Sequence, residues 1–278
     1  MKVESIKPHV GARIYVDKSS LCDPEVVASC LEMLEDRAVL VFPRIGLSDQ
    51  EQLAFTNRLG TQGEGTRNFP GANLVAKDVF ELSLRPENKS QAEYVKTSYF
   101  WHIDGVTSDD PWPKGTLLFA RRIAPKGGQT EFANTFAAYD ELPAGEKADI
   151  AELTALHTAL AAMRWVLESP SDAEKERLTS AFPPKAHPIV WTHGSGRKSL
   201  KIGISADYVI GMPVADGRAL LARLLEWAAQ REFTYRHHWE VGDLVVWNNH
   251  AVLHRALPYD ADSGRAMRRT SFEAAQAN

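Results

Sequence analysis

The apolar and polar positions of this chain repeat with two different periods. Helical spacing of the apolar residues predicts helices over residues 24–36, 48–59, 135–142, 145–157 and 216–231. Short, dense apolar runs predict strands over residues 10–16, 38–42, 98–103, 116–121, 130–133, 233–239, 242–247 and 266–272, and a hairpin over residues 187–203. Helices gather early, with one late in the chain, and strands dominate the rest. This order favours an α+β protein, mainly β, with an antiparallel double-stranded β-helix (jelly roll) core and flanking helices.

The same pattern predicts a single domain over residues 1–278. The chain has 278 residues, of which 44% are hydrophobic, and this is ample for one core. Residues 60–97 are mostly polar and rich in glycine and proline, so we expect a long loop there that acts as a lid or substrate loop, with one strand near Leu74. Residues 165–186 are also polar and are expected to form an insertion.

Charge and cysteine content narrow the class of protein. The formal net charge is −4 and basic residues form no long run, so no nucleic-acid partner is expected. No apolar stretch is long enough to span a membrane, and the first residues lack the apolar core of a signal peptide. The two cysteines, Cys22 and Cys30, form no CxxC pair, which favours a reducing compartment. A cytoplasmic protein is therefore expected.

One short motif carries the strongest chemical signal. His102 and Asp104 are two positions apart, so in a strand their side chains share one face. A second histidine, His254, follows the predicted strand 242–247. Two histidines and one carboxylate are the ligand set that holds Fe(II) and leaves positions open for oxygen and a co-substrate. Taken alone, a His-x-Asp pair more often forms an ordinary hydrogen bond on a strand.

Two arginines near the end of the chain suggest that anions are bound. Arg265 and Arg269 are four positions apart at the last predicted strand, so an extended backbone places them on one side, roughly 13 Å apart. A guanidinium binds a carboxylate with two parallel hydrogen bonds and keeps its charge. One arginine is therefore expected to bind one anion and the other a second anion. The alternative is a basic surface cluster that includes Arg268.

Longer stretches identify a family. The chain resembles the TauD/TfdA family of Fe(II)/2-oxoglutarate-dependent dioxygenases, from residue 40 to residue 272, and it is most similar to the TfdA branch, the aryloxyalkanoate dioxygenases. The stretches that carry the resemblance are GGQTEF (127–132), AAYDELP (137–143), HGSGRK (193–198), GMPVADG (211–217), QREFTYRH (230–237) and VLHR (252–255).

The resemblance implies a role for each matching residue. The iron ligands would be His102, Asp104 and His254. The distal carboxylate of 2-oxoglutarate would bind Thr130 and Arg265. The anionic group of the primary substrate would meet Arg269. Fe(II), 2-oxoglutarate and O2 would be required, ascorbate would support activity in vitro, and the protein would be a homo-oligomer, either a dimer or a tetramer.

The chain departs from the family at two places. The family often has Trp-Asp-Asn-Arg before the second histidine, whereas this chain has Trp247, Asn248, Asn249 and His250. His250 is thereby a rival ligand, although the Leu-His-Arg context favours the later histidine. Residues 77–99 match the TfdA branch poorly, so the identity of the substrate does not transfer. Trp112 is expected mainly in the core, with the lining of an aromatic substrate pocket as the alternative.

The predicted reaction is the hydroxylation of a C–H bond in a small anionic substrate, most simply a carboxylate, coupled to the decarboxylation of 2-oxoglutarate to succinate and CO2. Hydroxylation beside an ether oxygen or an amine nitrogen would lead to cleavage of that bond. Three alternatives stay open from the sequence. The same scaffold could act on an alkylsulfonate or sulfate ester or catalyse desaturation, the triad could hold Zn²⁺ for hydrolysis, or the jelly roll could be a non-catalytic binding protein.

Overall fold

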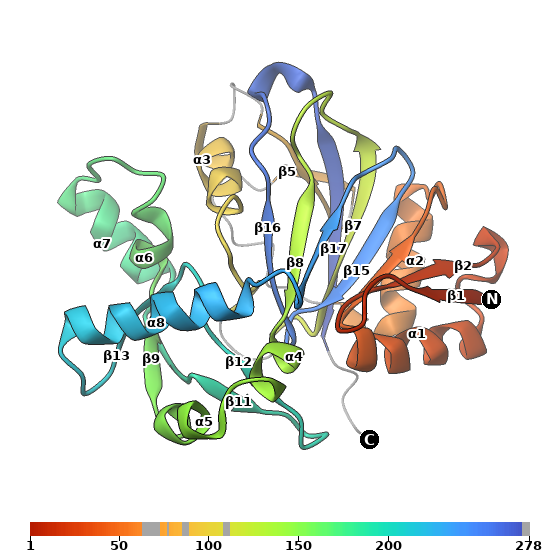
Figure 1. The fold of residues 1–278 in the computed structure, drawn as a ribbon. Coiled ribbons are helices and arrows are strands. Elements are labelled where there is room, and N and C mark those ends of the chain that lie inside the picture. Colours follow the sequence, from red (N-terminus) through yellow and green to blue (C-terminus); the bar gives the residue numbers. More distant parts are fainter. Residues whose placement is uncertain (63–72, 77, 85–88, 108–111, 274–278) are drawn as a thin grey trace.

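Two sheets face each other in the computed structural model, which describes residues 1–62, 73–76, 78–84, 89–107 and 112–273 (Figure 1). Their strands pair in antiparallel fashion, except for the parallel pair of the second and third strands of the larger sheet. The larger sheet contains, in spatial order, β1 (Lys2–Ser5), β2 (Ala12–Tyr15), β3 (Val39–Phe42), β15 (Leu244–Asn248), β7 (Gly115–Arg122), β17 (Ala266–Glu273), β6 (Val79–Leu82) and β5 (Asn73–Ala76), with β4 (Thr61–Gln62) paired to β17. The smaller sheet contains β14 (Thr234–His237), β8 (Thr130–Asn134) and β16 (Val252–Ala256). These facing sheets and their flanking helices confirm the predicted jelly roll.

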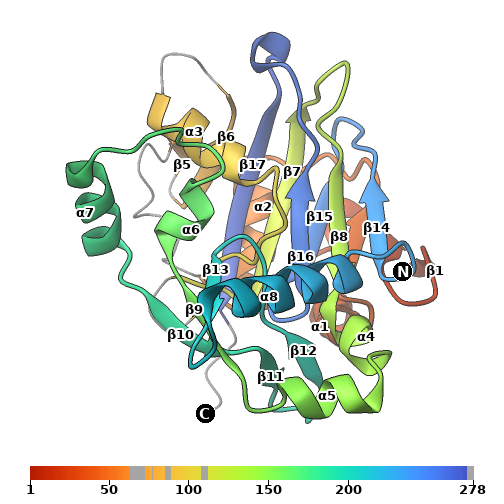
Figure 2. The same ribbon diagram turned by 60° about the vertical axis from the view of Figure 1, so that its left-hand side comes forward.

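The remaining elements flank this core. Two further sheet segments follow β8 in the chain: β10 (Lys185–Pro188), β9 (Thr154–His157) and β13 (Ala206–Val209), and the hairpin of β11 (Val190–Thr192) and β12 (Lys198–Leu200). The helices are α1 (Pro24–Arg37), α2 (Asp49–Leu59), α3 (Lys89–Thr97), α4 (Thr135–Asp140), α5 (Ala144–Ile150), α6 (Ala159–Met163), α7 (Asp172–Ala181) and α8 (Val214–Ala228). Figure 2 shows α7 standing out at one edge of the molecule. No helix in the described part of the chain is both long and apolar enough to span a bilayer.

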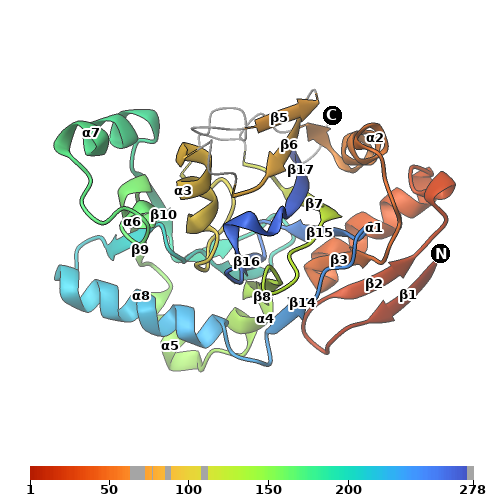
Figure 3. The same cartoon turned by 90° about the horizontal axis from the view of Figure 1, so that it is seen from above.

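The central strands of the larger sheet are buried on both faces, and this explains their unbroken apolar runs. On β3, Leu40 and Phe42 join the cluster formed with α1 and α2, whereas Val39 and Val41 join the cluster formed with the smaller sheet. The strands β7 and β15 alternate in the same way. Figure 3 shows α1 and α2 on one side of the sheet, and β14, β8 and β16 on the other. The helices thus cover the outer face, and the inner face is directed towards the smaller sheet.

Several predicted elements differ from the structure. Residues 98–103 do not form a regular strand, because only His102 makes a bridge and the preceding residues form a turn. The predicted helix 145–157 ends at Ile150 and continues as β9, which pairs with β10 and β13. The predicted loop 60–97 contains β4, β5, β6 and α3 in its described parts, while residues 63–72, 77 and 85–88 lie outside the described residues. The predicted insertion 165–186 contains α7. Tertiary pairing, which local periodicity does not report, accounts for the first two differences.

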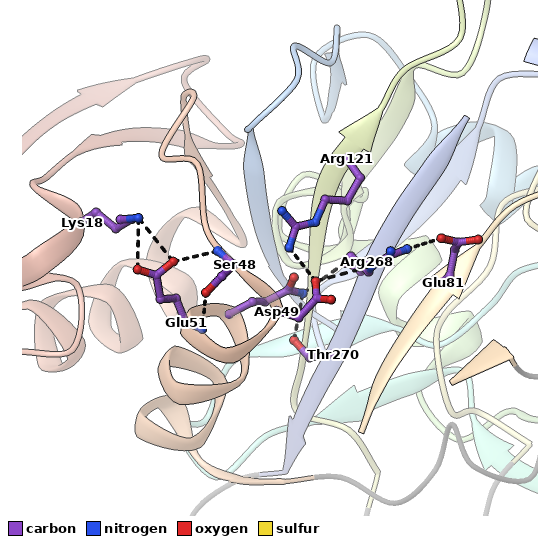
Figure 4. Close-up of polar contacts among 9 residues, drawn as sticks. Lys18, Ser48, Asp49, Glu51, Glu81, Arg121, Arg268 and Thr270 are labelled. Carbon is purple, nitrogen blue, oxygen red and sulfur yellow. Dashed lines mark hydrogen bonds and ion pairs between the residues drawn. The ribbon is translucent and has the colours of Figure 1, made fainter. Parts of the chain in front are cut away.

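Helix α2 anchors the outer face of β17 through the polar contacts drawn in Figure 4. Arg269 lies between Arg268 and Thr270 on this strand, so its side chain is on the opposite face. The side chain of Gln52 donates to Thr270 Oγ1 at 3.2 Å, and Asp49 contacts Arg268 and Arg121. Arg268 in turn pairs with Glu81 of β6. The odd positions of β17 are thereby left for the inner face, where Met267 is part of the core shared with the smaller sheet.

The start of α2 carries a capping box. Ser48 Oγ accepts from the amide of Glu51, and the Glu51 carboxylate accepts from the amide of Ser48 and from Lys18. Helix α7 has an equivalent capping box at Ser171, but none of the α7 side chains is buried. Helix α2 therefore packs against the core through buried side chains, whereas α7 does not.

We expect Ser48→Ala to lower the free energy of unfolding by about 1 kcal/mol, because a buried helix loses its capping hydrogen bond. The measurement is urea unfolding at neutral pH. Ser171→Ala is the matched control and is expected to leave the midpoint unchanged, since α7 can fray without opening the core. Equal losses in the two variants would show that α2 does not hold the core together.

Candidate active site

The two histidines of the predicted triad face each other across one antiparallel bridge. The amide of His102 donates to the carbonyl of His254 at 3.1 Å, and the amide of His254 donates to the carbonyl of His102 at 2.9 Å. The other edge of β16 pairs with β8. The bridge therefore joins the segment around residue 102 to the free edge of the smaller sheet and brings the two ring centroids to 4.1 Å.

Asp104 completes the group from the same segment. Its Oδ1 lies 3.9 Å from His102 Nε2, and its Oδ2 lies 3.7 Å from His254 Nε2. One nitrogen or oxygen from each of the three residues lies within 4.8 Å of the others, and among the described residues no other set of three or more His, Cys, Asp or Glu side chains meets this condition. The structure thus brings together the three residues that the sequence singled out.

The protonation of these side chains suits a metal. His102 Nδ1 lies 2.8 Å from the carbonyl oxygen of Phe100, which accepts only, so Nδ1 carries the proton and Nε2 keeps its lone pair. Burial lowers the pKa of His102 and lowers that of His254 well below its ordinary value, so both rings are neutral at pH 7. Burial alone would raise the pKa of Asp104, but the charge of Arg269, together with a hydrogen bond from Thr116, outweighs it and holds that pKa at about 2.

Two neutral imidazole nitrogens and one carboxylate fit the donor set of a divalent iron site. The rings are also held in place by packing, since His254 lies 4.7 Å from the ring of Trp247 and 6.3 Å from the ring of Phe132. Such support orients ligands before the metal arrives. These residues therefore satisfy the donor chemistry that Fe(II) requires.

The three side chains line a cavity of about 210 Å³, which Thr130, Arg265 and Arg269 also line. The residues that the sequence assigned to iron and to 2-oxoglutarate, and the second arginine, thus meet in one space. Much of the remaining lining is apolar and comes from α6, α7 and nearby segments. It includes Val106, Met163, Leu167, Leu178 and Phe182.

Arg265 is a buried cation without an acidic partner in the described part of the chain. Its guanidinium donates to the carbonyl of Gly128 at 3.3 Å and lies 4.7 Å over the ring of Tyr259. Burial lowers its pKa. Nearby, Thr130 Oγ1 accepts from the indole N–H of Trp239 at 2.9 Å, which leaves the threonine proton free to be donated. The pair offers a charge and a hydroxyl donor to an anion.

Arg269 has different surroundings. One of its terminal nitrogens lies 2.9 Å from Asp104 Oδ2, and its guanidinium also hydrogen-bonds with Tyr94 of α3. Its Nε is buried and has no hydrogen-bond partner among the described residues. Burial opposes the charge of this arginine, but Asp104 more than compensates and raises its pKa. Arg269 is therefore fixed in place and still has a donor to offer.

Two residues that the sequence considered lie elsewhere. Trp112 does not line the cavity, because its ring packs 4.9 Å from His187 and 5.1 Å from Trp191, with the ammonium of Lys201 at 4.0 Å. The structure places Trp112 in the core, and a substrate contact for Trp112 stays a prediction. The ring of the rival ligand His250 packs 4.4 Å from that of Trp191. His250 is not part of the group formed by His102, Asp104 and His254, which we call the metal-type group.

Sequence reasoning missed four residues that contact the site. These are Tyr94, Thr116, Gly128 and Asn249. Gly128 is the one that a signal could have revealed, since it lies in the GGQTEF stretch and has φ of +72°, a conformation that favours glycine. A Cβ at this position would lie 3.1 Å from Arg265 Nε. The glycine therefore makes room for the arginine.

Glu131 joins the strands that carry the site. It lies opposite Arg236 of β14 and Arg255 of β16, and its two carboxylate oxygens each contact one of them at 2.7 Å. Arg255 also lies 4.6 Å over the ring of Trp101, beside the first histidine. Burial raises the pKa of Glu131, but the hydrogen bonds from the two arginines outweigh it and leave the pKa lowered.

Comparisons with known proteins agree with this geometry. Residues 2–271 match the family described as taurine catabolism dioxygenase TauD, TfdA family. An alpha-ketoglutarate-dependent 2,4-dichlorophenoxyacetate dioxygenase of Cupriavidus pinatubonensis is 39% identical over 86% of this chain and 85% of its own length. An alkylsulfatase of Acinetobacter baylyi is 29% identical over 98% of this chain and 84% of its own length. The crystal structure of AAD-2 in complex with Mn(II) and N-oxalylglycine matches with a TM-score of 0.82 and 28% identity, covering 99% of this chain and 98% of that one.

The chain belongs to the TauD/TfdA family. This membership confirms the predicted enzyme class, a 2-oxoglutarate-dependent dioxygenase that uses Fe(II), 2-oxoglutarate and O2. The resemblance to the TfdA branch is confirmed as well.

We expect Glu131→Gln to destabilise the protein by on the order of 1 kcal/mol at neutral pH, because both arginine contacts lose their charge. A lowered folded-state pKa contributes stability above the ordinary pKa of 4.5 and loses it as the pH falls through the folded value. The difference between wild type and variant in urea unfolding should therefore shrink below pH 4.5. Glu146→Gln is the control, because Glu146 also pairs with an arginine, Arg223, but is more exposed than Glu131. A difference that does not change with pH would contradict the ion-pair origin.

Proposed function

We propose that this enzyme hydroxylates a C–H bond of a small anionic substrate, with a carboxylate as the anionic group and an apolar body. The observation that carries this proposal is the single cavity in which the metal-type group, two buried arginines and an apolar wall meet. With Fe(II), 2-oxoglutarate and O2 bound, the site supplies oxidation of a C–H bond, coupled to the conversion of 2-oxoglutarate into succinate and CO2.

His102, Asp104 and His254 are proposed as the iron ligands. Their support is that both imidazoles are neutral, that the carboxylate is ionised, and that their donor atoms converge. His250 is excluded from this role, because its ring lies in a separate group of aromatic side chains. These three residues would therefore hold the metal and would leave room beside it for the co-substrate and oxygen.

Thr130 and Arg265 are proposed to bind the distal carboxylate of 2-oxoglutarate. A buried guanidinium without a carboxylate partner is costly, and an anion that enters the cavity would relieve that cost. The hydroxyl of Thr130 accepts from Trp239, so its proton can be donated to the same anion. The carbonyl of Gly128 and the ring of Tyr259 orient the guanidinium for this contact.

Arg269 is proposed to bind the anionic group of the primary substrate. Its contacts with Asp104 and Tyr94 fix the guanidinium plane, while its buried Nε keeps a donor for the ligand. The apolar side chains from α6 and α7 would then cover the rest of the substrate and exclude water. An aryloxyalkanoate has this combination of one carboxylate and one apolar ring. Hydroxylation of the carbon next to its ether oxygen would break the C–O bond and release a phenol.

A second candidate is an alkyl sulfate ester or an alkylsulfonate. It is favoured by the relative named alkylsulfatase, which matches almost the whole chain. A sulfate or sulfonate also presents a compact anion to an arginine. Desaturation would consume the same co-substrates but would leave no new oxygen in the product, so product analysis separates it from hydroxylation.

A cytoplasmic location and a homo-oligomeric state are also part of the proposal. Both cysteines are free thiols, and burial raises the pKa of Cys30 to about 12, which makes it unreactive. A reducing cytoplasm suits such a chain. A dimer or tetramer is proposed from the family resemblance, and ascorbate is expected to sustain activity in vitro.

The direct test is a substrate panel of aryloxyalkanoates, alkyl sulfates and alkylsulfonates, with succinate measured in the presence of Fe(II), ascorbate and 2-oxoglutarate. We expect substrate-dependent succinate with a member of the first class. His102→Ala should abolish it, because one metal ligand is lost, whereas His250→Ala should retain it. A fully active His102→Ala enzyme would refute the ligand set. Succinate that no member of the panel stimulates would refute the substrate class.

A second test concerns Gly128. We expect Gly128→Ala to raise the KM for 2-oxoglutarate by roughly tenfold or more, because the added Cβ pushes against the Arg265 side chain and displaces a charged hydrogen bond. Gly196→Ala is a matched control, since Gly196 also has positive φ but no atom within 4 Å of an added Cβ. An unchanged KM in a folded Gly128→Ala enzyme would argue against Arg265 as the carboxylate receptor.

A further inference from the structure

Three residues outside the ligand set form a hydrogen-bonded chain that ends on the metal-type carboxylate. Thr116 of β7 donates its hydroxyl to Asp104 Oδ2 at 2.8 Å. The side-chain amide of Asn249 donates to Thr116 Oγ1 at 2.9 Å and to the carbonyl of Pro113 at 3.1 Å. Thr116 and Asn249 are fully buried, so bulk water does not compete for these bonds.

The direction of each hydrogen bond in this chain is determined. The carbonyl of Pro113 can only accept, so the amide of Asn249 must present its NH2 group on that side. The same NH2 group then donates to Thr116 Oγ1. The threonine hydroxyl, which already accepts one bond, has its proton left for Asp104. The carbonyl of Pro113 therefore fixes the orientation of the Asn249 amide. That amide in turn directs the hydroxyl proton of Thr116 towards Asp104.

This arrangement makes the two oxygens of Asp104 unequal. Oδ2 accepts from Thr116 at 2.8 Å and contacts Arg269 at 2.9 Å. Within the described part of the chain Oδ1 has no comparable contact, and the neutral ring nitrogen His102 Nε2 lies 3.9 Å from it. One oxygen is thereby fully engaged by the protein, and the other is left available.

We infer that Asn249 and Thr116 are positioning residues that hold Asp104 by Oδ2, so that Oδ1 is the oxygen offered to the metal. This inference rests on the metal ligands proposed above. It also assigns a role to the stretch that departs from the family pattern: Asn248 bonds the amide of His250 at 3.0 Å and thereby shapes the turn. Asn249, by contrast, reaches towards the metal-type group.

The test is a titration of the complete protein with Mn(II), in which the electron paramagnetic resonance signal of the free ion measures how much Mn(II) is bound. Thr116→Val keeps the size of the side chain but removes the hydroxyl, and it is expected to weaken Mn(II) binding by about 10- to 100-fold. Thr116→Ser restores the donor and should bind as wild type does. If Thr116→Val does not give a cooperative thermal transition, Thr116→Ala replaces it. Mn(II) binding as tight as wild type in the variant without the hydroxyl would overturn the inference.

Asn249 is tested separately. Asn249→Leu is expected to weaken Mn(II) binding less than Thr116→Val does, because the hydroxyl can still donate but is no longer oriented. Asn248→Leu is the matched control, since it removes an equally buried amide that does not contact Thr116. The double variant Thr116→Val, Asn249→Leu should bind no more weakly than Thr116→Val alone. Losses that add in full would show that Asn249 acts by another route and would overturn its place in the chain.

His102→Ala separates this inference from the ligand assignment. If wild type binds one Mn(II) and His102→Ala does not, the ligand set stands, and an unaffected Thr116→Val then refutes the positioning role alone. If His102→Ala binds Mn(II) as wild type does, the ligand set itself is wrong.

Discussion

The antiparallel bridge between His102 and His254 is the contact on which this active site depends. Two backbone hydrogen bonds across that bridge place the residues directly opposite each other, although they lie far apart in the chain. The side chains of such a pair must project on the same face, so the two imidazoles become neighbours without any further device. Asp104 follows two positions later and joins them from the same segment. The bridge therefore brings residues that are far apart in the sequence together in one metal-type group.

The two faces of β17 have different neighbours: one face contacts α2 and the other faces the cavity. On the outer face, Arg268 and Thr270 bind α2, which is itself fixed by the capping box at Ser48. On the inner face, Arg269 reaches the cavity and contacts Asp104. Because successive side chains of a strand point to opposite faces, a rigid support on one side holds the functional side chain on the other. The contacts of the outer face therefore hold Arg269 in position.

Burial and one ion pair determine the charges of the side chains in the site. The two imidazoles are neutral because they are buried, and the single carboxylate is kept ionised by Arg269. Arg265, in contrast, has no acidic partner in the described part of the chain and is surrounded by a carbonyl and an aromatic ring. Arg269 is thus paired with a protein carboxylate and keeps Nε as an unused donor, whereas the guanidinium of Arg265 has no carboxylate beside it among the described residues. This difference supports separate roles for two residues that look equivalent in the sequence.

Much of the fold and most of the site could be predicted from local patterns. The capping box at Ser48, the amphipathic helix α8 and the strands buried on both faces follow from spacing and composition, because these properties report how one segment meets a core. The His-x-Asp spacing and the long family stretches were enough to single out the residues that the fold brings together in one cavity. The packing of a segment against distant segments, however, is not encoded in its periodicity.

That packing decided the rest. Residues 98–103 have an apolar pattern typical of a strand, yet only His102 is bridged, to β16, while the carbonyl of Trp101 accepts from the amide of Ile204 instead of from a strand. Packing also placed Trp112 against Trp191 instead of in the cavity and brought Asn249 and Thr116 to the carboxylate. The sequence by itself determined which residue types were available for iron chemistry and for anions. Only the tertiary structure decided which of them meet, since hydrogen bonds between segments far apart in the chain depend on the whole fold.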